Sequence, residues 1–427
     1  MRKKLLTLMA ASLLASSAWA SGFQVLLQGN RSTAMGNLGV AVSPDVSSVF
    51  FNPGALAMMD QTGGAMIGLN LIQSNSAFYD SQTENSIYTA ETENPMGTPF
   101  HLYAAHGNDK FKVGLGVYTP YGSNVDWEAD WKGQFLLDQI ELRAIFVQPT
   151  ASYRITENIS IGGGPVYAFG SVNLQRDLPF NNAEGQGSIE LDGDASGWGY
   201  NVGVFFTLSE KVNLGFSYRS KVDMEVDDGD VIYTNVPALA SPLFPADNSF
   251  SASLPLPSNT NIGITYMPTE QWSIGFEANM VGWGAYEALA FDFEKEGADG
   301  EGLQDSSSPR NYEDSFVFHL GAEYRLSDVV ALRGGGYYDQ TPVQLGYMTP
   351  ETPDANRVGL TAGVGLTFGN LVLDASFLYI NGEERTQTTQ DALDAGTLNP
   401  DAGTQDVLPG TYKLNAFIPG LSASYKF

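Results

Sequence analysis

The residue types that most often perform catalysis or bind metals are few in this chain of 427 residues, and they do not cluster. There is no cysteine, which excludes disulfides, thiolate metal sites and cysteine nucleophiles. Of the three histidines, His101 and His106 lie five apart on one expected strand and so point to opposite faces, and His319 is isolated. A Ser-His-Asp arrangement of distant residues stays possible, but no G-x-S-x-G motif accompanies it. We therefore expect no enzyme, no metal site and no cofactor.

Two runs of three glycines, Gly162–Gly164 and Gly334–Gly336, could in principle approach a phosphate group. Both fall within expected strands, where a glycine weakens the strand and often marks a close approach of another backbone. We interpret them as places where missing side chains make room for a segment packed inside the fold.

Residues 1–20 have the composition of a secretory signal peptide. Three basic residues at positions 2 to 4 precede an apolar run that ends at Leu14, and Ala18-Trp19-Ala20 follows as a cleavage motif. The run is shorter than the roughly 20 residues that a spanning helix needs, so we expect cleavage before Ser21. No later stretch is apolar enough to form such a helix, and a membrane location would have to be achieved with strands.

The mature chain is strongly acidic. Cleavage removes three of the 21 Lys and Arg residues and leaves 18 against 48 Asp and Glu, a net charge of −30. This balance excludes nucleic acid as a partner, because such binding needs a basic surface. Much of the acid lies in long connections such as 227–230 and 294–301, where it is typical of a solvated surface. Divalent cations bridging these carboxylates to lipopolysaccharide are the alternative.

The elements that must carry any site are strands, because apolar and polar residues alternate with period two along most of the chain. A soluble sandwich would also alternate, but several stretches reach or exceed the ~9 to 11 residues of a tilted membrane strand. About fourteen stretches show the pattern: 64–74, 99–106, 111–118, 140–154, 159–176, 197–208, 212–226, 251–267, 272–293, 314–326, 330–339, 356–368, 371–382 and 411–427.

Short and long connections alternate between these stretches, and an even number of strands returns both ends to one side. This is the arrangement of an outer-membrane barrel, whose closure also removes the sheet edges that lipid cannot satisfy. We therefore predict an all-β protein whose residues 60–427 form an antiparallel transmembrane β-barrel of about 14 strands. On the last strand, Phe417, Leu421, Ala423, Tyr425 and Phe427 should face lipid. The terminal aromatic residue resembles the signature of proteins handed to the barrel assembly machinery.

Residues 21–59 differ from the strands because they combine small and polar residues and cannot form a core alone. We interpret them as a plug, or hatch, inside the barrel. They begin with Gly22-Phe23-Gln24 and end near Asn52-Pro53-Gly54. This segment resembles the hatch of the FadL family of outer-membrane proteins, which opens with Gly-Phe-Gln and ends with Asn-Pro-Ala. Gly54 departs from that pattern.

The resemblance extends over the mature chain through shorter matches at 218–220, 254–283 and 339–343. It implies a monomer in the outer membrane of a Gram-negative cell, in contact with its lipid and lipopolysaccharide. The family carries long-chain fatty acids and other hydrophobic compounds. The resemblance therefore implies passive uptake of such molecules, with fatty acids as the first expectation and aromatic hydrocarbons as the nearest competitor. A hydrophilic porin, or a surface adhesin that uses the long acidic loops, would be the alternative.

One family feature falls on Pro120, Tyr121 and Gly122, where family members have an inward kink that opens a gap in the barrel wall. Proline removes a ladder donor and glycine tolerates unusual dihedrals, so these residues are suited to interrupting strand pairing. The alternative is an ordinary strand end.

A fatty acid needs an apolar tunnel for its chain and a cation for its carboxylate, because a buried unpaired charge is costly. The resemblance places Arg176 at a lumenal arginine that family members use for the carboxylate. A second family basic residue aligns near Ser308, two positions from Arg310. Phe23 would be the hatch side chain in the same pocket. For both arginines, an ordinary interfacial position is the alternative.

An outer loop is unusually rich in apolar residues, and exposed apolar patches of this kind tend to mark binding sites. The family resemblance suggests an outer hydrophobic groove here, although a self-packed loop cluster would have the same composition. The residues are Trp127, Trp131, Phe135, Leu136 and Leu137.

Overall fold

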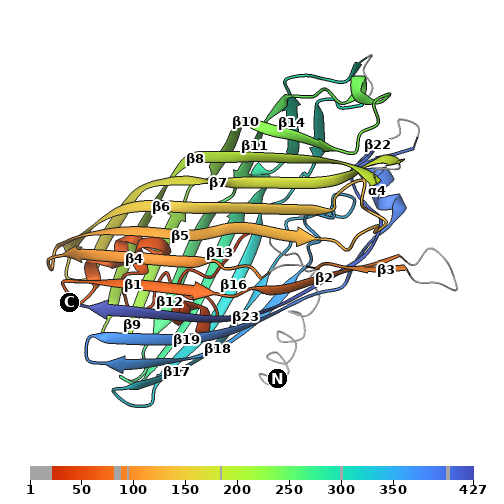
Figure 1. Cartoon of the computed structure of the whole chain (residues 1–427). Coiled ribbons are helices and arrows are strands. Elements are labelled where there is room, and N and C mark those ends of the chain that lie inside the picture. The colour runs from red at the N-terminus through yellow and green to blue at the C-terminus, as the bar shows by residue number, and fades with distance from the viewer. Residues whose placement is uncertain (1–21, 81–87, 94–95, 183–184, 299–301, 401–403) are drawn as a thin grey trace, which may run out of the picture.

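The computed structural model describes residues 22–80, 88–93, 96–182, 185–298, 302–400 and 404–427. The predicted signal peptide, residues 1–20, lies outside the described residues. Figure 1 shows one barrel, with the long connections at the end opposite the C-terminus. Within the described residues, no helix has the length and apolarity to cross a membrane.

Fourteen strands close the barrel in the described part of the chain, and each is antiparallel to both of its neighbours. The ring closes where the last strand pairs with the first, at Leu69 opposite Leu421. In ring order the strands are β1 (Gly63–Asn70), β4 (Phe100–Gly107), β5 (Phe111–Asp126), β6 (Gln139–Thr156), β7 (Ile159–Asn182), β8 (Gly185–Ser209), β9 (Val212–Arg219), β12 (Ser258–Tyr266), β13 (Trp272–Gly282), β16 (Ser315–Arg325), β17 (Val330–Asp339), β18 (Arg357–Phe368), β19 (Leu371–Gly382) and β23 (Gly410–Lys426).

Shorter elements lie mainly at the outer end of the barrel, where several of them prolong its wall. Figure 1 shows β10, β11 and β14 there, beside the ends of β7 and β8. The elements are β2 (Gln73–Asp80), β3 (Tyr88–Glu91), β10 (Val222–Thr234), η2 (Ser241–Leu243), β11 (Asn248–Leu256), η3 (Trp283–Ala285), β14 (Ala288–Phe293), β15 (Ser306–Pro309), β20 (Arg385–Gln387), α4 (Thr389–Ala395), β21 (Leu398–Asn399) and β22 (Thr404–Gln405).

The fourteen expected stretches correspond to the fourteen barrel strands, but four of them are divided in the structure. The stretch 212–226 breaks between β9 and β10, where the inward face changes from odd residues such as Ser217 to even residues such as Met224. The stretch 251–267 breaks at Pro257, which has no N–H to continue a ladder. The stretch 272–293 breaks at η3, and 64–74 breaks between β1 and β2.

The distribution of side chains is that of a barrel in lipid. Leu320, Leu360 and Leu421 are exposed on the outer face, whereas polar residues such as Ser217 and Glu277 are buried inside. An apolar exterior around a polar interior is the reverse of a soluble protein and typical of an outer-membrane barrel. The lipid-facing set predicted for the last strand is confirmed for Phe417, Leu421, Tyr425 and Phe427, which are exposed, whereas Ala423 is partly buried.

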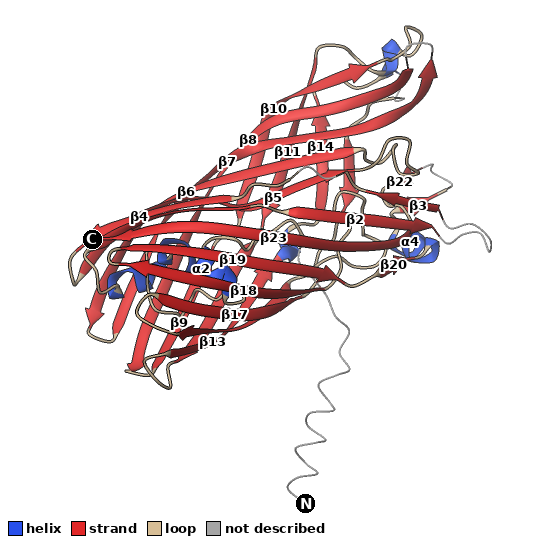
Figure 2. Ribbon diagram, turned by 60° about the horizontal axis from the view of Figure 1, so that its bottom comes forward, coloured by secondary structure: helices blue, strands red, loops and turns tan. Residues whose placement is uncertain are grey.

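Residues 22–59, which we call the hatch segment, lie inside the ring of strands. They contain α2 (Asn30–Ala34), α3 (Ser48–Phe51) and η1 (Pro53–Met58), and Figure 2 shows short helices within the barrel. At the end of this segment, the Asn52 side chain accepts a hydrogen bond from Gly54 N and donates to Val40 O and Val204 O, at 3.1, 2.9 and 3.0 Å. One amide therefore joins the turn, the hatch segment and the β8 wall.

Close packing explains the glycines at this contact. A Cβ atom on Gly54 would lie 2.6 Å from Gly203 O, so alanine could not replace it without a backbone shift. The interpretation of the glycine runs is also confirmed at two positions. A Cβ on Gly162 would lie 2.3 Å from Pro53 O, and one on Gly335 would lie 2.7 Å from Gly36 N.

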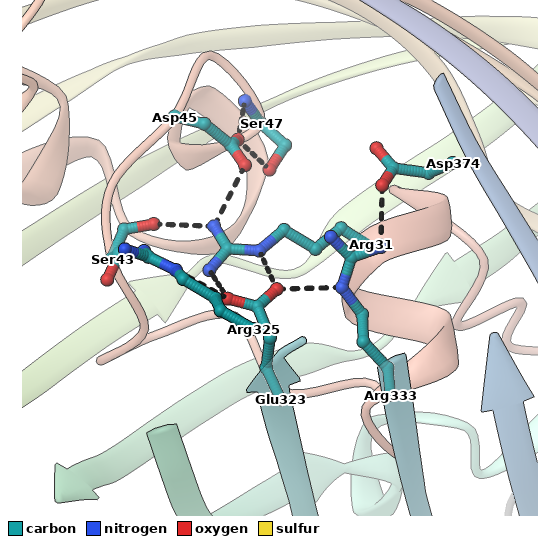
Figure 3. A network of polar contacts seen from close by, with 8 residues as sticks. All are labelled: Arg31, Ser43, Asp45, Ser47, Glu323, Arg325, Arg333 and Asp374. Carbon is teal, nitrogen blue, oxygen red and sulfur yellow. Dashed lines mark hydrogen bonds and ion pairs between the residues drawn. The ribbon is translucent and has the colours of Figure 1, made fainter. Parts of the chain in front are cut away.

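A buried ion network fixes helix α2 to three strands (Figure 3). Arg31 on α2 binds Glu323 on β16 at 3.1 Å and Asp45 in the hatch segment at 3.5 Å. Arg333 on β17 binds the same Glu323 at 2.7 Å and reaches Asp374 on β19 at 2.6 Å. Glu323 is buried and shared by two arginines whose side chains are 16% and 5% exposed, so its charge is compensated where it holds the hatch segment to the wall.

Replacing Glu323 with glutamine should loosen the hatch segment without opening the barrel. Removing one partner of a buried ion pair costs roughly 3–5 kcal/mol because the remaining charge is uncompensated. Amide hydrogen exchange should therefore become faster in residues 30–51 and stay unchanged in β16 and β17. Arg325→Gln is the control. Arg325 is mostly exposed, and its contact with Glu323, at 3.9 Å, is longer than those of Arg31 and Arg333. Equal exchange in Glu323→Gln and wild type would contradict the anchoring role.

Candidate functional site

Strand β5 carries a bulge at the predicted kink. Tyr118 pairs with Phe146 on β6 but Tyr121 pairs with Ala144, so β5 has one extra residue between them. The bulge reverses the alternation, because Tyr118 faces the lumen before it and Tyr121 and Val125 after it. Tyr121 is consequently turned into the barrel.

On its other side, β5 loses its neighbour β4 at the level of the bulge. Pairing of β4 with β5 ends at His101 opposite Tyr118, and the chain before β4 turns to the other side, where Gly97 bridges to Ile72. The backbone of β5 after Tyr118 therefore has a free edge. An unpaired edge within a membrane is costly unless another segment covers it.

The first residues of the hatch segment cover this edge. Gln24 forms an antiparallel bridge with Tyr121, with Val25 N donating to Pro120 O at 2.8 Å and Gly122 N donating to Phe23 O at 3.1 Å. The Gln28 side chain donates to the carbonyl of the bulge residue before Pro120 at 2.8 Å. We call residues 22–28 the gate segment, because they take the place of the missing strand.

Aromatic rings hold the gate segment from the lumen side. Phe23 is buried edge-on against Trp283, Tyr286 and Tyr121, with ring centroids 4.9, 6.0 and 6.3 Å away. The Tyr121 hydroxyl donates to the carbonyl of Pro257 at 2.8 Å. Gate and kink therefore share one cluster of rings.

A single amide joins the two sides of this contact. Asn259 on β12 donates to the Tyr121 hydroxyl at 3.0 Å and accepts a hydrogen bond from Gln24 at 2.7 Å. Any outward movement of the gate segment must therefore break this link as well as the two backbone hydrogen bonds.

A cavity of about 580 Å³ lies in the barrel beside the bulge. Its inner wall includes Leu378 and Ile418, which are buried in the barrel. Its outer wall includes Gly122, Arg143 and Ile145. Since Leu142, Ala144 and Phe146 are the buried, inward-facing set of β6, Arg143 and Ile145 lie on the outward face. The lining of the cavity therefore includes both inward-facing and outward-facing residues of the wall, and we call it the wall chamber.

A smaller cavity of about 60 Å³, the upper chamber, lies on the other side of Phe23. Apolar side chains dominate its lining, among them Val172, Leu174, Met224, Val226, Leu254 and Phe291. The two chambers share six lining residues: Phe23, Ser123, Leu142, Arg143, Glu351 and Thr352. The gate phenylalanine therefore lies at the boundary between an apolar chamber and a wall opening.

The two arginines named from the sequence have different surroundings. Arg310 is buried, 3% exposed, forms an ion pair with Glu351 and donates to Ser308 Oγ at 2.6 Å. Its partner Glu351 lines both chambers. Arg176 is exposed near the outer end of β7 and lines neither chamber. The structure thus brings Arg310, but not Arg176, close to Phe23.

Most of the predicted outer groove is packed inside the loop. The Trp127 and Trp131 rings stack at 4.3 Å, and both side chains are buried with Leu137. Phe135 is 46% exposed and Leu136 is partly buried, so two of the five residues reach the surface. The stacked pair packs against Phe78 and Tyr412 from strands far away in sequence. The two tryptophans are therefore packed against each other and against strands β2 and β23, and the outer groove stays a prediction.

Several site residues had no role assigned from the sequence. Trp283 and Tyr286 follow β13 and form the ring cluster, and Asp354 accepts a hydrogen bond from Gly22 N at 3.2 Å. Glu351 and Asp354 belong to a connection without strand periodicity. In the sequence, only Trp-Gly-Ala-Tyr at 283–286 could have indicated this cluster, because two large aromatic residues lie where the expected strand becomes irregular.

Two carboxylates meet in the outer loops. Asp138 N donates to Gln175 O at 2.8 Å, and Asp177 N donates to Gln134 O at 2.9 Å, which brings the two side chains together. Burial, followed by the charge of Asp177, raises the pKa of Asp138 to about 7. Among the described residues, no three acidic or histidine side chains are grouped to hold a metal ion.

The fold and cavities together define an outer-membrane transport barrel with an internal hatch. The comparisons with known proteins agree. Residues 11–427 match the model of the family described as outer membrane protein transport protein (OMPP1/FadL/TodX). The chain belongs to this family, which is a transport family and not an enzyme family, and it is an outer-membrane protein.

Similar proteins include a long-chain fatty acid transport protein and a toluene transporter. The chain is 23% identical to a long-chain fatty acid transport protein of Escherichia coli O6:H1, over 88% of this chain and 90% of that protein. It is 24% identical to outer membrane protein P1 of Haemophilus influenzae over the full length of both. A crystal structure of a Pseudomonas aeruginosa FadL homologue shares the fold with a TM-score of 0.78 and 20% identity, covering 95% and 100% of the two chains. The crystal structure of the Ralstonia pickettii toluene transporter TbuX shares the fold with a TM-score of 0.68 and 18% identity, covering 94% of this chain and 100% of that one.

Replacing Phe23 with alanine should release the gate segment. Truncating a buried phenylalanine costs roughly 3–5 kcal/mol, which here is lost from the contacts that hold the gate closed. We expect current fluctuations in planar bilayers to become more frequent and larger than in wild type. Phe135→Ala, a change to an exposed loop ring, should leave the currents unaltered. A silent Phe23→Ala channel would show that the ring does not hold the gate.

The packing of the 127–138 loop should depend on pH. An unfolded Asp138 ionises near its ordinary pKa of 3.8, whereas the folded group keeps its proton to about pH 7. Stability of the loop is therefore full at low pH and is lost as the pH rises from about 4 through 7. Protection factors of amides in this loop should fall over that range. Asp138→Asn should remove the dependence, and Asp109→Asn in a short turn should not. A flat wild-type profile would contradict the assignment.

Proposed function

We propose that this protein takes up hydrophobic small molecules passively and releases them sideways through the barrel wall. The observation that carries the proposal is the wall chamber, whose lining runs from buried residues of the lumen to Gly122 and Arg143 beside the β5 bulge. Beside the bulge it is covered by the gate segment, which is not one of the fourteen barrel strands. Membership of a transport family supports the same direction.

The route begins at the outer end of the barrel. A ligand enters the upper chamber, whose lining of Val172, Met224 and Phe291 suits an apolar molecule. It then displaces Phe23, which separates this chamber from the wall chamber, and leaves past Gly122 into the bilayer. Lateral exit avoids exposing the ligand to the periplasm. For a ligand with ~200 Å² of apolar surface, that exposure would cost roughly 5 kcal/mol at about 25 cal/mol per Å².

The gate segment is held more weakly than the rest of the hatch segment, which supports movement of the gate segment by itself. Two backbone hydrogen bonds hold the gate segment to β5, and each contributes only about 1 kcal/mol net. The core of the hatch segment is held instead by Arg31, Glu323 and Arg333 and by close packing at glycines. A ligand could therefore move residues 22–28 while the rest of the hatch segment stays in place.

Filling the mouth of the wall chamber should stop transport. A Cβ on Gly122 would meet only Leu142 O, at 3.2 Å, so a larger side chain there projects into the opening. Gly122→Trp should reduce uptake of labelled oleate or toluene on the order of tenfold in cells that lack a channel of their own, because close-packed interiors exclude further volume. Gly122→Ala is the matched control and should transport normally.

Assembly of both variants is checked by the heat-dependent shift of the barrel on a detergent gel. A correctly assembled Gly122→Trp protein that transports like wild type would rule out lateral exit at this position. Loss of transport in both variants would point to a backbone disturbance and would equally deny the proposed steric block.

A further inference from the structure

The charges around the two chambers bear on which hydrophobic molecules can enter. Two arginines line the wall chamber, and both already have carboxylate partners. Arg143 donates to Glu141 at 2.7 Å, and Arg357 lies 3.7 Å from Asp339 and 3.6 Å from Asp354. Together with Glu351, the described lining holds four carboxylates and two guanidinium groups. Among the side chains that line the chamber, a ligand carboxylate would therefore find no guanidinium group without a carboxylate partner.

The third arginine, Arg310, lies directly behind this lining. It is enclosed near Tyr286 and Tyr312, whose rings are 5.0 Å apart, and it is not itself part of the chamber surface. The only carboxylate that it reaches in the described structure belongs to Glu351. Glu351 is mostly buried and lines both chambers at their boundary with Phe23. An internal carboxylate therefore stands between the buried cation and the ligand space.

We propose that Glu351 determines the ligand class of this transporter: it fills the anion position beside Arg310, so that the lumen accepts uncharged hydrophobic molecules and excludes those with a carboxylate. This inference rests on the proposed function, because it takes the two chambers as the transport site. A ligand carboxylate would have to leave water and lie against Glu351 in a region of low dielectric, whereas an alcohol or a hydrocarbon meets no such repulsion.

Removing the charge of Glu351 should reverse this preference. Glu351→Gln keeps the size and shape of the side chain but leaves Arg310 as a buried cation without a carboxylate. A ligand carboxylate then supplies the missing partner, which is the favourable arrangement for a buried charge. The preference should follow the charge at position 351 and should require Arg310.

The test uses two ligands with the same chain, 11-bromoundecanol and 11-bromoundecanoate, whose bromine quenches tryptophan fluorescence when bound near Trp283. The assembled full-length protein is studied in lipid nanodiscs. Wild type should bind the alcohol at least about tenfold more tightly than the carboxylate, the scale expected when a charge must be buried without a partner. Glu351→Gln should gain carboxylate affinity by about tenfold or more and keep its affinity for the alcohol.

Three further variants complete the design. Arg310→Met combined with Glu351→Gln should lose the gained carboxylate binding. Glu351→Ser tests the same charge removal with another side chain, so the result does not depend on the assembly of one variant. Glu313→Gln, at an exposed loop residue, should behave as wild type.

Equal affinity of wild type for both ligands, or an unchanged ratio in Glu351→Gln and Glu351→Ser, would overturn the role of Glu351. In either case, binding of the alcohol would leave the proposed transport function intact. If wild type bound neither ligand and neither entered cells, the proposed function would fail, and this inference would fail with it.

Discussion

The structure depends on one requirement of a membrane barrel: every backbone N–H and C=O at the level of the lipid must have a partner. The bulge at Pro120 and the departure of the chain before β4 break this rule for one edge of β5. The gate segment restores it through Val25 N, Phe23 O and the Gln28 side chain. The gate segment thus completes the barrel wall beside β5, while the rest of the hatch segment plugs the lumen.

This arrangement divides the hatch segment into two parts with different attachments. The core, around α2 and Asn52, is fixed by shared ion pairs and by backbone contacts at Gly54 and Gly162 that allow no additional atom. The gate segment is held by a few hydrogen bonds and by the rings around Phe23. The gate segment can move because its few weak hydrogen bonds can be exchanged for contacts with a ligand. The core cannot, because a buried charge is not released without compensation.

The sequence predicted the fold well because period-two alternation, strand length and connection length are local properties. The number of strands, the lipid-facing set ending at Phe427 and the room made by the glycine runs all followed from short patterns. The breaks inside four expected stretches were missed because a change of face, as after Arg219, leaves the apolar pattern almost intact. Contacts between distant segments could not be predicted either. The burial of Trp131 depends on Phe78 and Tyr412, and the state of Arg310 depends on Glu351, 41 residues later.

For a ligand to cross, the gate segment must leave β5. The most direct test is a disulfide between Gln24→Cys and Tyr121→Cys, which are opposite each other in the antiparallel bridge, in a chain that has no other cysteine. Uptake of labelled toluene by cells that lack their own channel should be lost under oxidising conditions and restored by a reductant. Each single-cysteine variant should transport equally under both conditions. Full uptake by the cross-linked protein would contradict the account.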